Sequence, residues 1–310
     1  MCIRDSFRGV PSLVEPGLDP AWIARTVAVA LDEDLGPAPG RDVTTQATIP
    51  RSATGVADLV AREAGTVAGL VVVPEALRQV AERLDLRVPE VAFEARDGDD
   101  VAPGQVLATV AGPAQVLLIA ERTLLNLASR ASGVATATRA FARALEGTGA
   151  TVLDTRKTTP GLRALQKYAV RAGGGTNKRM GLYDVAMVKD NHVVAAGSVA
   201  DAVKAVRTVF PEVPVQVEAD TTAQAIEALS AGADFLLLDN MPTQVLAETV
   251  KAVRAREGRD GVPAHVELEA TGNLTVERAR EVAGTGVDHL SVGALTHSAP
   301  ILDLALDLRA

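Results

Sequence analysis

The sequence has 310 residues and a formal net charge of −8, and it is 47% hydrophobic but only 3% aromatic. That length allows two domains or one large barrel with an additional part. The acidic balance argues against binding to duplex nucleic acid, and the scarcity of aromatic rings argues against single strands, which usually stack on such rings. We therefore expect no nucleic-acid partner.

The chain contains one cysteine, Cys2, so neither an internal disulfide nor a zinc site built from cysteines can form. It has no apolar run of about 18 residues, which a membrane-spanning helix needs, and no visible signal peptide. We expect no membrane partner and a cytoplasmic location. The first six residues have neither an apolar core nor a cleavage pattern, and we assign them no role.

The first part of the chain predicts an α+β domain. Residues 21–34 and 74–84 have helical patterns, whereas residues 53–73 and 87–111 alternate like antiparallel strands. A long helical pattern then runs from 112 to about 147 and is interrupted at Ser132 and Gly133. We place the domain boundary in this region. Residues 1–129 are expected to form an N-terminal α+β sandwich domain and residues 130–310 a second domain.

The second part repeats one pattern, in which a short apolar run ends in a polar residue and a helical stretch follows. The expected strands are 151–154, 185–189, 215–218, 235–239, 266–269 and 289–292. The expected helices are 161–172, 198–209, 221–231, 243–257, 275–284 and 300–309, and the last could pack on the first domain. Successive β-α units imply a parallel sheet. The regular repeat favours a six-stranded β/α barrel, which would be TIM-like and either closed or incomplete. The pattern does not exclude the alternative of a doubly wound sheet.

In either architecture the ligand site lies at the carboxyl ends of the strands. The residues at or just after these ends are Arg156, Lys157, Lys189, Glu218, Asp239, Glu269 and Gly293. Burial alone would favour apolar or small residues there, so this edge of the sheet is predicted to be functional.

Residues 154–190 are basic, in contrast to the acidic chain as a whole. They contain eight lysines and arginines against three aspartates, gathered around Gly173, Gly174 and Gly175. Such a cluster indicates a site for phosphates and carboxylates. For Arg163 and Lys167, which are spaced i, i+4, a solvated helix face is an equally good interpretation.

An ordered set of segments covering about residues 20–308 resembles quinolinate phosphoribosyltransferases. The segments are 42–45, 121–126, 154–163, 166–171, 173–175, 179–184, 189–192, 217–218, 238–241, 269–273 and 292–297. The resemblance implies a glycosyltransferase of NAD biosynthesis. Such an enzyme joins quinolinate to phosphoribosyl pyrophosphate with magnesium, and it releases nicotinate mononucleotide, pyrophosphate and carbon dioxide.

The resemblance also implies roles for individual residues. The two carboxylates of quinolinate would be bound by Arg122, Arg156 and Arg179, with positive charge added by Lys178 and Lys157. The pyrophosphate would be held by Lys157, Lys189 and Arg171. The 5′-phosphate would meet the backbone of Gly272 and Gly293, with Thr271 and His297 beside it.

Glu218 and Asp239 would bind Mg²⁺ and the ribose hydroxyls and would stabilise a cationic ribose C1. The catalytic set is therefore Lys157, Lys189, Glu218 and Asp239, and no protein nucleophile is needed. The resemblance further implies a homodimer with shared active sites, in which Arg122 completes the partner's site.

The chain departs from the family pattern at Lys178, where many members have histidine, and at Thr271, where serine is common. His265 and His289 flank strands and are expected to be structural, and Glu267 is expected to point away from the site. His192 is expected to shape its loop. Two other functions stay open: a related pyridine phosphoribosyltransferase without decarboxylation, and a non-catalytic phosphosugar-binding barrel.

Overall fold

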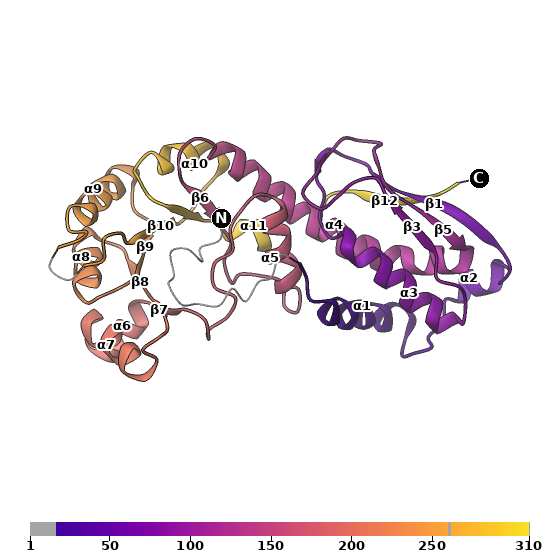
Figure 1. The fold of residues 1–310 in the computed structure, drawn as a ribbon, viewed down its shortest axis with the longest axis horizontal. Coiled ribbons are helices and arrows are strands. Elements are labelled where there is room, and N and C mark those ends of the chain that lie inside the picture. Colours follow the sequence, from indigo (N-terminus) through magenta and orange to yellow (C-terminus); the bar gives the residue numbers. More distant parts are fainter. Residues whose placement is uncertain (1–16, 260–261, 310) are drawn as a thin grey trace. The chain divides into compact units, whose positions relative to one another are not determined.

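The computed structural model describes residues 17–259 and 262–309, which divide into two compact units (Figure 1). The barrel unit contains residues 140–157 and 175–297, and the N-terminal unit contains residues 17–139, 158–174 and 298–309. The division falls within the same long helical region as the boundary expected near residue 129. Cys2 and the six opening residues lie outside the described residues.

The N-terminal unit is built on an antiparallel sheet with the strand order β12-β1-β5-β3. These strands are β1 (Thr54–Ala61), β3 (Glu90–Phe93), β5 (Val106–Pro113) and β12 (Leu304–Leu308), and β2 (Gly65–Thr66) pairs separately with β4 (Asp100–Val101). The helices are α1 (Pro20–Leu35), α2 (Val43–Thr48), α3 (Val73–Leu84), most of α4 (Ala114–Ala144) and α5 (Arg163–Ala172). Figure 1 shows α1 and α3 side by side. The predicted α+β character is confirmed.

Two expectations about this unit are wrong. Residues 300–309 do not form a helix, because Leu304–Leu308 is strand β12 and pairs with β1. Its leucines alternate with other residues, which is the two-residue period of a strand. Helix α4 also continues through Ser132 and Gly133. A Cβ on Gly133 would lie 1.9 Å from the Pro300 carbonyl oxygen, so this glycine permits a close backbone approach and does not end the helix.

The barrel unit contains a six-stranded parallel sheet with the order β6-β11-β10-β9-β8-β7. The strands are β6 (Thr151–Leu153), β7 (Ala186–Val188), β8 (Val215–Ala219), β9 (Phe235–Asp239), β10 (Glu267–Thr271) and β11 (His289–Ser291). All six expected strands are confirmed. Among the described residues β6 and β7 do not pair with each other and are the two edges of the sheet. Of the two expected forms, closed and incomplete, the barrel therefore has the incomplete one.

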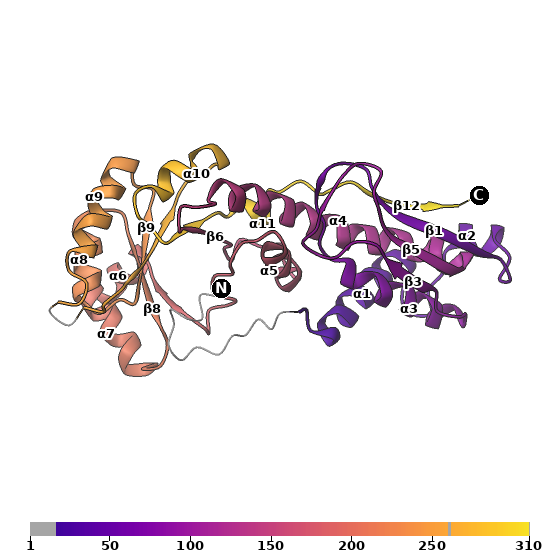
Figure 2. The same cartoon turned by 45° about the horizontal axis from the view of Figure 1, so that its top comes forward.

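Helices follow the strands of the barrel unit, and Figure 2 shows α8 and α9 on the outer side of the sheet. They are α6 (Asp190–Ala196), α7 (Val199–Val209), α8 (Thr222–Ser230), α9 (Thr243–Arg254), α10 (Val276–Ala283) and α11 (Ala294–His297). Cap residues set their starts, as where the Ser198 hydroxyl accepts from the Asp201 N–H. No helix among the described residues is long and apolar enough to span a membrane.

Candidate active site

A cleft of about 240 Å³ lies at the carboxyl ends of the barrel strands. Its lining contains most of the barrel residues that the sequence singled out, together with apolar side chains from the strands. The lining residues are Thr155, Arg156, Lys157, Lys178, Arg179, Met187, Lys189, Glu218, Leu237, Asp239, Glu269, Thr271 and Ser291. The cleft lies wholly within the barrel unit and holds charged groups of both signs.

Two guanidinium groups, those of Arg156 and Arg179, line the cleft. Arg179 Nη1 donates to the Val185 carbonyl oxygen at 2.9 Å, which fixes the direction of the side chain. Burial and, after it, the charge of Arg156 lower the pKa of Arg179, while Asp184 and Glu269 oppose the shift. Like charges held together in a half-buried cleft favour a bound anion, and guanidinium forks suit carboxylates.

Lys178 enters the same cleft from the loop after α5. The buried carboxylate of Asp154 accepts the Lys178 backbone N–H at 2.9 Å, which ties this loop to the end of β6. Lys178 Nζ lies 2.5 Å from Glu269 Oε1. Glu269 also accepts from Gln216 Nε2 at 2.7 Å and from the Ser291 hydroxyl. A buried carboxylate with several donors is well placed to orient the lysine ammonium.

The acidic side of the cleft is formed by Glu218, Asp239 and the adjacent Asp220, which each offer an oxygen within 4.8 Å of the others. Lys189 forms an ion pair with Glu218. Burial raises the pKa of Asp239, with Glu218 and Asp220 adding to the shift and Lys189 and Lys157 opposing it. Oxygen ligands in such a group suit Mg²⁺.

Asp220 was not singled out from the sequence, although a signal was present. It lies two residues after Glu218, and residues two apart in a strand share one face. Gln216, within β8, and Ser291, the last residue of β11, were missed as well. Extending the same alternation inward from the strand ends would have identified them.

Gly293, Lys157 and His297 lie close together at the end of β11. A Cβ on Gly293 would lie 3.1 Å from Lys157 Cδ and 3.1 Å from His297 Nε2, so any larger residue here would press against both side chains. The Thr296 hydroxyl donates to the Lys157 carbonyl oxygen at 2.8 Å and ties α11 to the loop after β6. This region therefore combines exposed cationic and imidazole groups with accessible backbone.

Gly272 occupies the equivalent position after β10 and has a φ of +99°, which favours glycine. A Cβ there would lie 2.9 Å from Asn240 Cα, so the chain also approaches the end of β9 closely. Thr271 immediately precedes it and lines the cleft. His192 Nδ1 accepts the Lys189 N–H at 3.0 Å and shapes the start of α6.

Two predicted site residues belong to the N-terminal unit. Arg122 lies on α4 and lines a separate pocket of about 660 Å³, and Arg171 lies on α5. The barrel cleft taken by itself thus lacks both residues. Lys167, also on α5, has no exposed surface, so the solvated-face interpretation is wrong for this lysine.

A parallel β/α barrel with guanidinium, ammonium and carboxylate groups at its strand ends defines a class of enzymes that act on phosphorylated and carboxylated small molecules. Comparison with known families narrows this class. The model of the quinolinate phosphoribosyl transferase N-terminal domain matches residues 42–132, and that of the C-terminal domain matches residues 134–307. The chain belongs to the quinolinate phosphoribosyltransferase family.

Individual relatives agree with this assignment. The chain is 49% identical over 283 residues to a nicotinate-nucleotide pyrophosphorylase (carboxylating) from Mycobacterium leprae, covering 91% of this chain and 96% of the relative. It is 41% identical over 277 residues to a probable enzyme of the same name from Bacillus subtilis, covering 89% and 90%. The solved nicotinate-nucleotide pyrophosphorylase from Francisella tularensis matches with a TM-score of 0.84 at 31% identity, covering 95% and 98%.

Proposed function

We infer that this protein transfers the phosphoribosyl group of phosphoribosyl pyrophosphate to quinolinate with decarboxylation, as a nicotinate-nucleotide pyrophosphorylase (carboxylating) of NAD biosynthesis. Membership of the family and the named relatives support the reaction. The observation that carries it within the molecule is the pairing of Arg156 and Arg179 with Lys178 in one cleft that also contains Glu218 and Asp239.

Quinolinate carries two adjacent carboxylates. Arg156 and Arg179 supply forked donors for them, and Lys178 adds a third positive charge from a fixed position beside Glu269. The ion pair with Glu269 balances the charge of Lys178, so the two guanidinium charges match two carboxylates, and a pyridine with one carboxylate would leave one of them unmatched. The cleft is thus expected to select quinolinate over nicotinate.

Phosphoribosyl pyrophosphate would bind across the remaining strand ends. Lys157 and Lys189 are assigned to the pyrophosphate, and the backbone N–H groups near Gly272 and Gly293 to the 5′-phosphate, with Thr271 and His297 beside them. Glu218 and Asp239 would accept hydrogen bonds from the ribose hydroxyls. Arg171 is assigned to the pyrophosphate through the family resemblance.

The reaction then needs charge stabilisation and no protein nucleophile. As the bond from ribose C1 to pyrophosphate breaks, C1 becomes positive, and the carboxylates of Glu218 and Asp239 stabilise that charge. The quinolinate ring nitrogen forms the new bond to C1. The C2–carboxylate bond then breaks and carbon dioxide leaves, while the bonding electron pair stays on C2, where the adjacent positive ring nitrogen stabilises it. C2 finally takes up a proton from water.

Mg²⁺ fits the oxygen donors of Glu218, Asp220 and Asp239. When bound there it would neutralise charge on the pyrophosphate leaving group. Lys189 would share this task, because its ammonium already lies against Glu218 at the edge of the same group.

We further propose that the active protein is a homodimer in which Arg122 completes the quinolinate site of the partner subunit. The proposal rests on the family resemblance and on the position of Arg122 in the N-terminal unit, in a pocket separate from the barrel cleft. A cytoplasmic location remains a prediction from the sequence.

The deciding experiment compares turnover of quinolinate and nicotinate by the purified chain with phosphoribosyl pyrophosphate and Mg²⁺. Release of carbon dioxide and nicotinate mononucleotide from quinolinate is expected, with little or no product from nicotinate. Equal rates with both pyridines would instead favour the related transferase that does not decarboxylate. Binding of the phosphosugar without any turnover would favour the non-catalytic barrel.

A further inference from the structure

Arg179 lies in a stretch of irregular backbone between helix α5 and strand β7. Residues 177–185 form neither helix nor strand, although Lys178 and Arg179 within them line the catalytic cleft. A helix or a strand would supply acceptors for the backbone N–H groups of such a segment. Here other groups must hold the backbone, and the positions of the two cations depend on those groups.

Asp184 supplies such acceptors for the backbone that follows Arg179. Its Oδ2 accepts the Met180 N–H, and its Oδ1 accepts the Gly181 N–H at 3.3 Å. Both oxygens of one carboxylate are thus bound to successive backbone N–H groups, and these charge-assisted hydrogen bonds close a turn from Met180 to Asp184. The turn begins at the residue directly after Arg179, so its geometry sets the direction in which the arginine side chain leaves the backbone.

The side chain of Arg179 is held at the other end of the same turn. Its Nη1 donates to the Val185 carbonyl oxygen at 2.9 Å, and its Nη2 lies 3.4 Å from Met187 Sδ. Val185 directly follows Asp184, so a change in the turn would move the carbonyl oxygen that holds the guanidinium. These contacts use only part of the five N–H donors of an arginine, which leaves the group suited to a substrate carboxylate as well.

Apolar packing contributes little to holding this turn. Leu182 and Tyr183, at its tip, are 72% and 69% exposed. The Tyr183 ring lies against the backbone of Gly181, where a Cβ would be 2.3 Å from Tyr183 Cε1. Since the tip buries so little surface, the hydrogen bonds of Asp184 are a principal constraint on the turn.

The charge of Asp184 acts on Arg179 in the same sense. Burial and, after it, the charge of Arg156 lower the pKa of Arg179, whereas the charges of Asp184 and then of Glu269 oppose that shift. A nearby carboxylate lowers the free-energy cost of holding two guanidinium groups together before an anion binds. Asp184 therefore favours the arrangement of Arg156 and Arg179 that the cleft needs.

We propose that Asp184 is a positioning residue for quinolinate, because it holds the turn that directs the Arg179 guanidinium into the cleft. The inference rests on the proposed function, in which Arg179 binds a carboxylate of quinolinate. Among the described residues that line the cleft Asp184 is absent, so it would act through Arg179 and not by contact with the substrate. Phosphoribosyl pyrophosphate is assigned to other strand ends and should bind independently of Asp184.

The test measures the Kd of quinolinate by calorimetric titration of the full chain. Asp184→Asn replaces one acceptor oxygen by an NH₂ group and should raise this Kd about tenfold or more, the usual effect of losing a hydrogen bond to a charged group. Asp184→Glu keeps two carboxylate oxygens and should restore part of the affinity. The Kd of phosphoribosyl pyrophosphate with Mg²⁺ should stay unchanged in both variants, which a general disturbance of the barrel would not allow.

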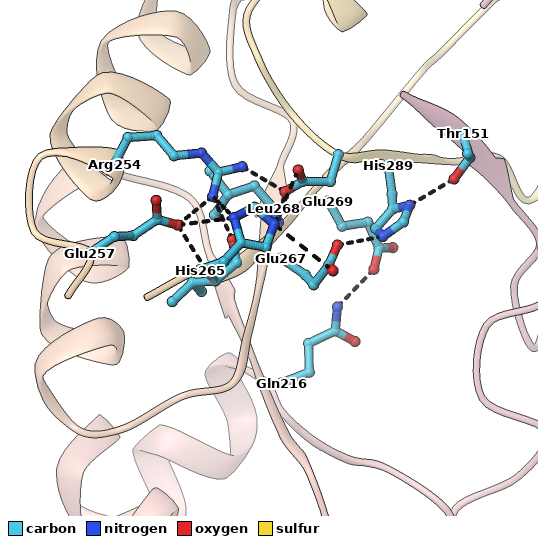
Figure 3. Close-up of polar contacts among 11 residues, drawn as sticks. Thr151, Gln216, Arg254, Glu257, His265, Glu267, Leu268, Glu269 and His289 are labelled. Carbon is cyan, nitrogen blue, oxygen red and sulfur yellow. Dashed lines mark hydrogen bonds and ion pairs between the residues drawn. The ribbon is translucent and has the colours of Figure 1, made fainter. Parts of the chain in front are cut away.

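Asp288 provides a matched control at the opposite, amino-terminal end of the sheet, just before β11. Its Oδ2 accepts from Arg254 Nη2 at 2.6 Å and from the Leu268 N–H at 2.7 Å, and Figure 3 labels both partners. Asp288→Asn therefore also changes a carboxylate that is bound to a backbone N–H in the barrel unit. Its Kd for quinolinate should remain at the wild-type value even where its melting temperature falls.

This end of the sheet is separated from the cleft by a layer of side chains. Glu267, at the first position of β10, does not point away from the site as expected from the sequence. It shares the strand face of Glu269 and lies one layer deeper, where it contacts His289 while Glu269 contacts Ser291 (Figure 3). The control substitution thus lies beyond the layer that borders the cleft.

Coupling to Arg179 gives a readout that a merely structural role would not move. In an Arg179→Ala background, adding Asp184→Asn should change kcat/KM for quinolinate little, as expected for two residues that act as one unit. Wild-type affinity in Asp184→Asn, or full additivity with Arg179→Ala, would overturn the inference and leave the proposed function intact. Absence of quinolinate binding to the wild type would overturn the proposed function and the inference together.

Discussion

The ammonium of Lys178 lies 2.5 Å from Oε1 of Glu269, a carboxylate with no exposed surface. Glu269 is held in turn by Gln216 and Ser291. The resemblance to the family leads us to expect a histidine at this position, and the chain has Lys178 instead. A lysine is longer and more flexible than a histidine, so a buried carboxylate that fixes its end compensates for that freedom. We infer that Glu269 is a positioning residue for Lys178.

Replacement of Lys178 by alanine is expected to lower kcat/KM for quinolinate by about 10- to 100-fold, the usual effect of losing one charged hydrogen bond. Steady-state kinetics with quinolinate as the varied substrate measures this. Lys204→Ala, which removes an exposed lysine of α7, is the matched control and should keep wild-type kinetics. A Lys178→Ala enzyme with normal kcat/KM would remove Lys178 from the substrate site.

Glu269→Gln should also lower kcat/KM for quinolinate, because the Lys178 ammonium is then no longer held in place. Since the two side chains act together, the double variant is expected to be little worse than Lys178→Ala, with a coupling of about 1 kcal/mol or more. A double-mutant cycle on kcat/KM measures this coupling free energy between Lys178 and Glu269. Strict additivity would mean that Glu269 affects the barrel without acting through Lys178.

Lys189→Ala and Asp239→Ala are each expected to reduce turnover by at least about a hundredfold, the scale for removing a positioned electrostatic group. Both residues lie at strand ends in the cleft and are partly exposed, so neither substitution is expected to lower the free energy of unfolding much. Turnover and urea unfolding of each variant are compared with wild type. A folded variant with near-normal rate would exclude that residue from the catalytic set.

The pH dependence of the activity should reflect the ionisation of Asp239, whose pKa is raised by burial and by Glu218 and Asp220. A raised folded-state pKa means that Asp239 keeps its proton to a higher pH than an ordinary aspartate. Activity, which needs the carboxylate, should therefore fall on acidification while ordinary aspartates remain ionised. In Asp239→Asn the residual activity should lack this acidic limb of the profile.

The same shift predicts the sign of an effect on stability. A raised pKa stabilises the protonated folded protein below the unfolded pKa, and that contribution is lost as the pH rises through the folded pKa. Asp239→Asn should therefore gain stability relative to wild type as the pH rises from about 4 to 7. Urea unfolding across this range would contradict the assignment if the difference between the two proteins stayed constant.

A mixture of inactive Arg122→Ala and inactive Lys189→Ala proteins should regain activity if Arg122 serves the partner's barrel. A mixed dimer would then carry both defects in one site and neither in the other. Random exchange gives about half mixed dimers with one intact site each, so about a quarter of wild-type activity is expected. No recovery, in a sample whose subunits have exchanged by mass spectrometry, would place Arg122 in its own chain's site or in none.

Local patterns in the sequence were sufficient for the elements of the barrel. Strand β9, for example, is buried from Phe235 to Leu238 and then ends in the half-buried Asp239. An apolar run, a charged residue, a turn and a helical stretch follow one another within a short segment of the chain. This local order predicts each strand and, because a helix connects it to the next strand, a parallel direction. That is why the six strands and the residues at their carboxyl ends could be predicted.

The partners across long sequence separations were decided only by the tertiary structure. Lys178 and Glu269 are 91 residues apart, and nothing local indicates that a loop after α5 meets the middle of β10. Likewise the alternation in residues 304–308 does not show that β12 pairs with β1, and the helical pattern around Gly133 does not show that Pro300 passes against it. Short-range periodicity specifies an element and its exposed face, whereas the partner of a side chain depends on which distant elements pack beside it.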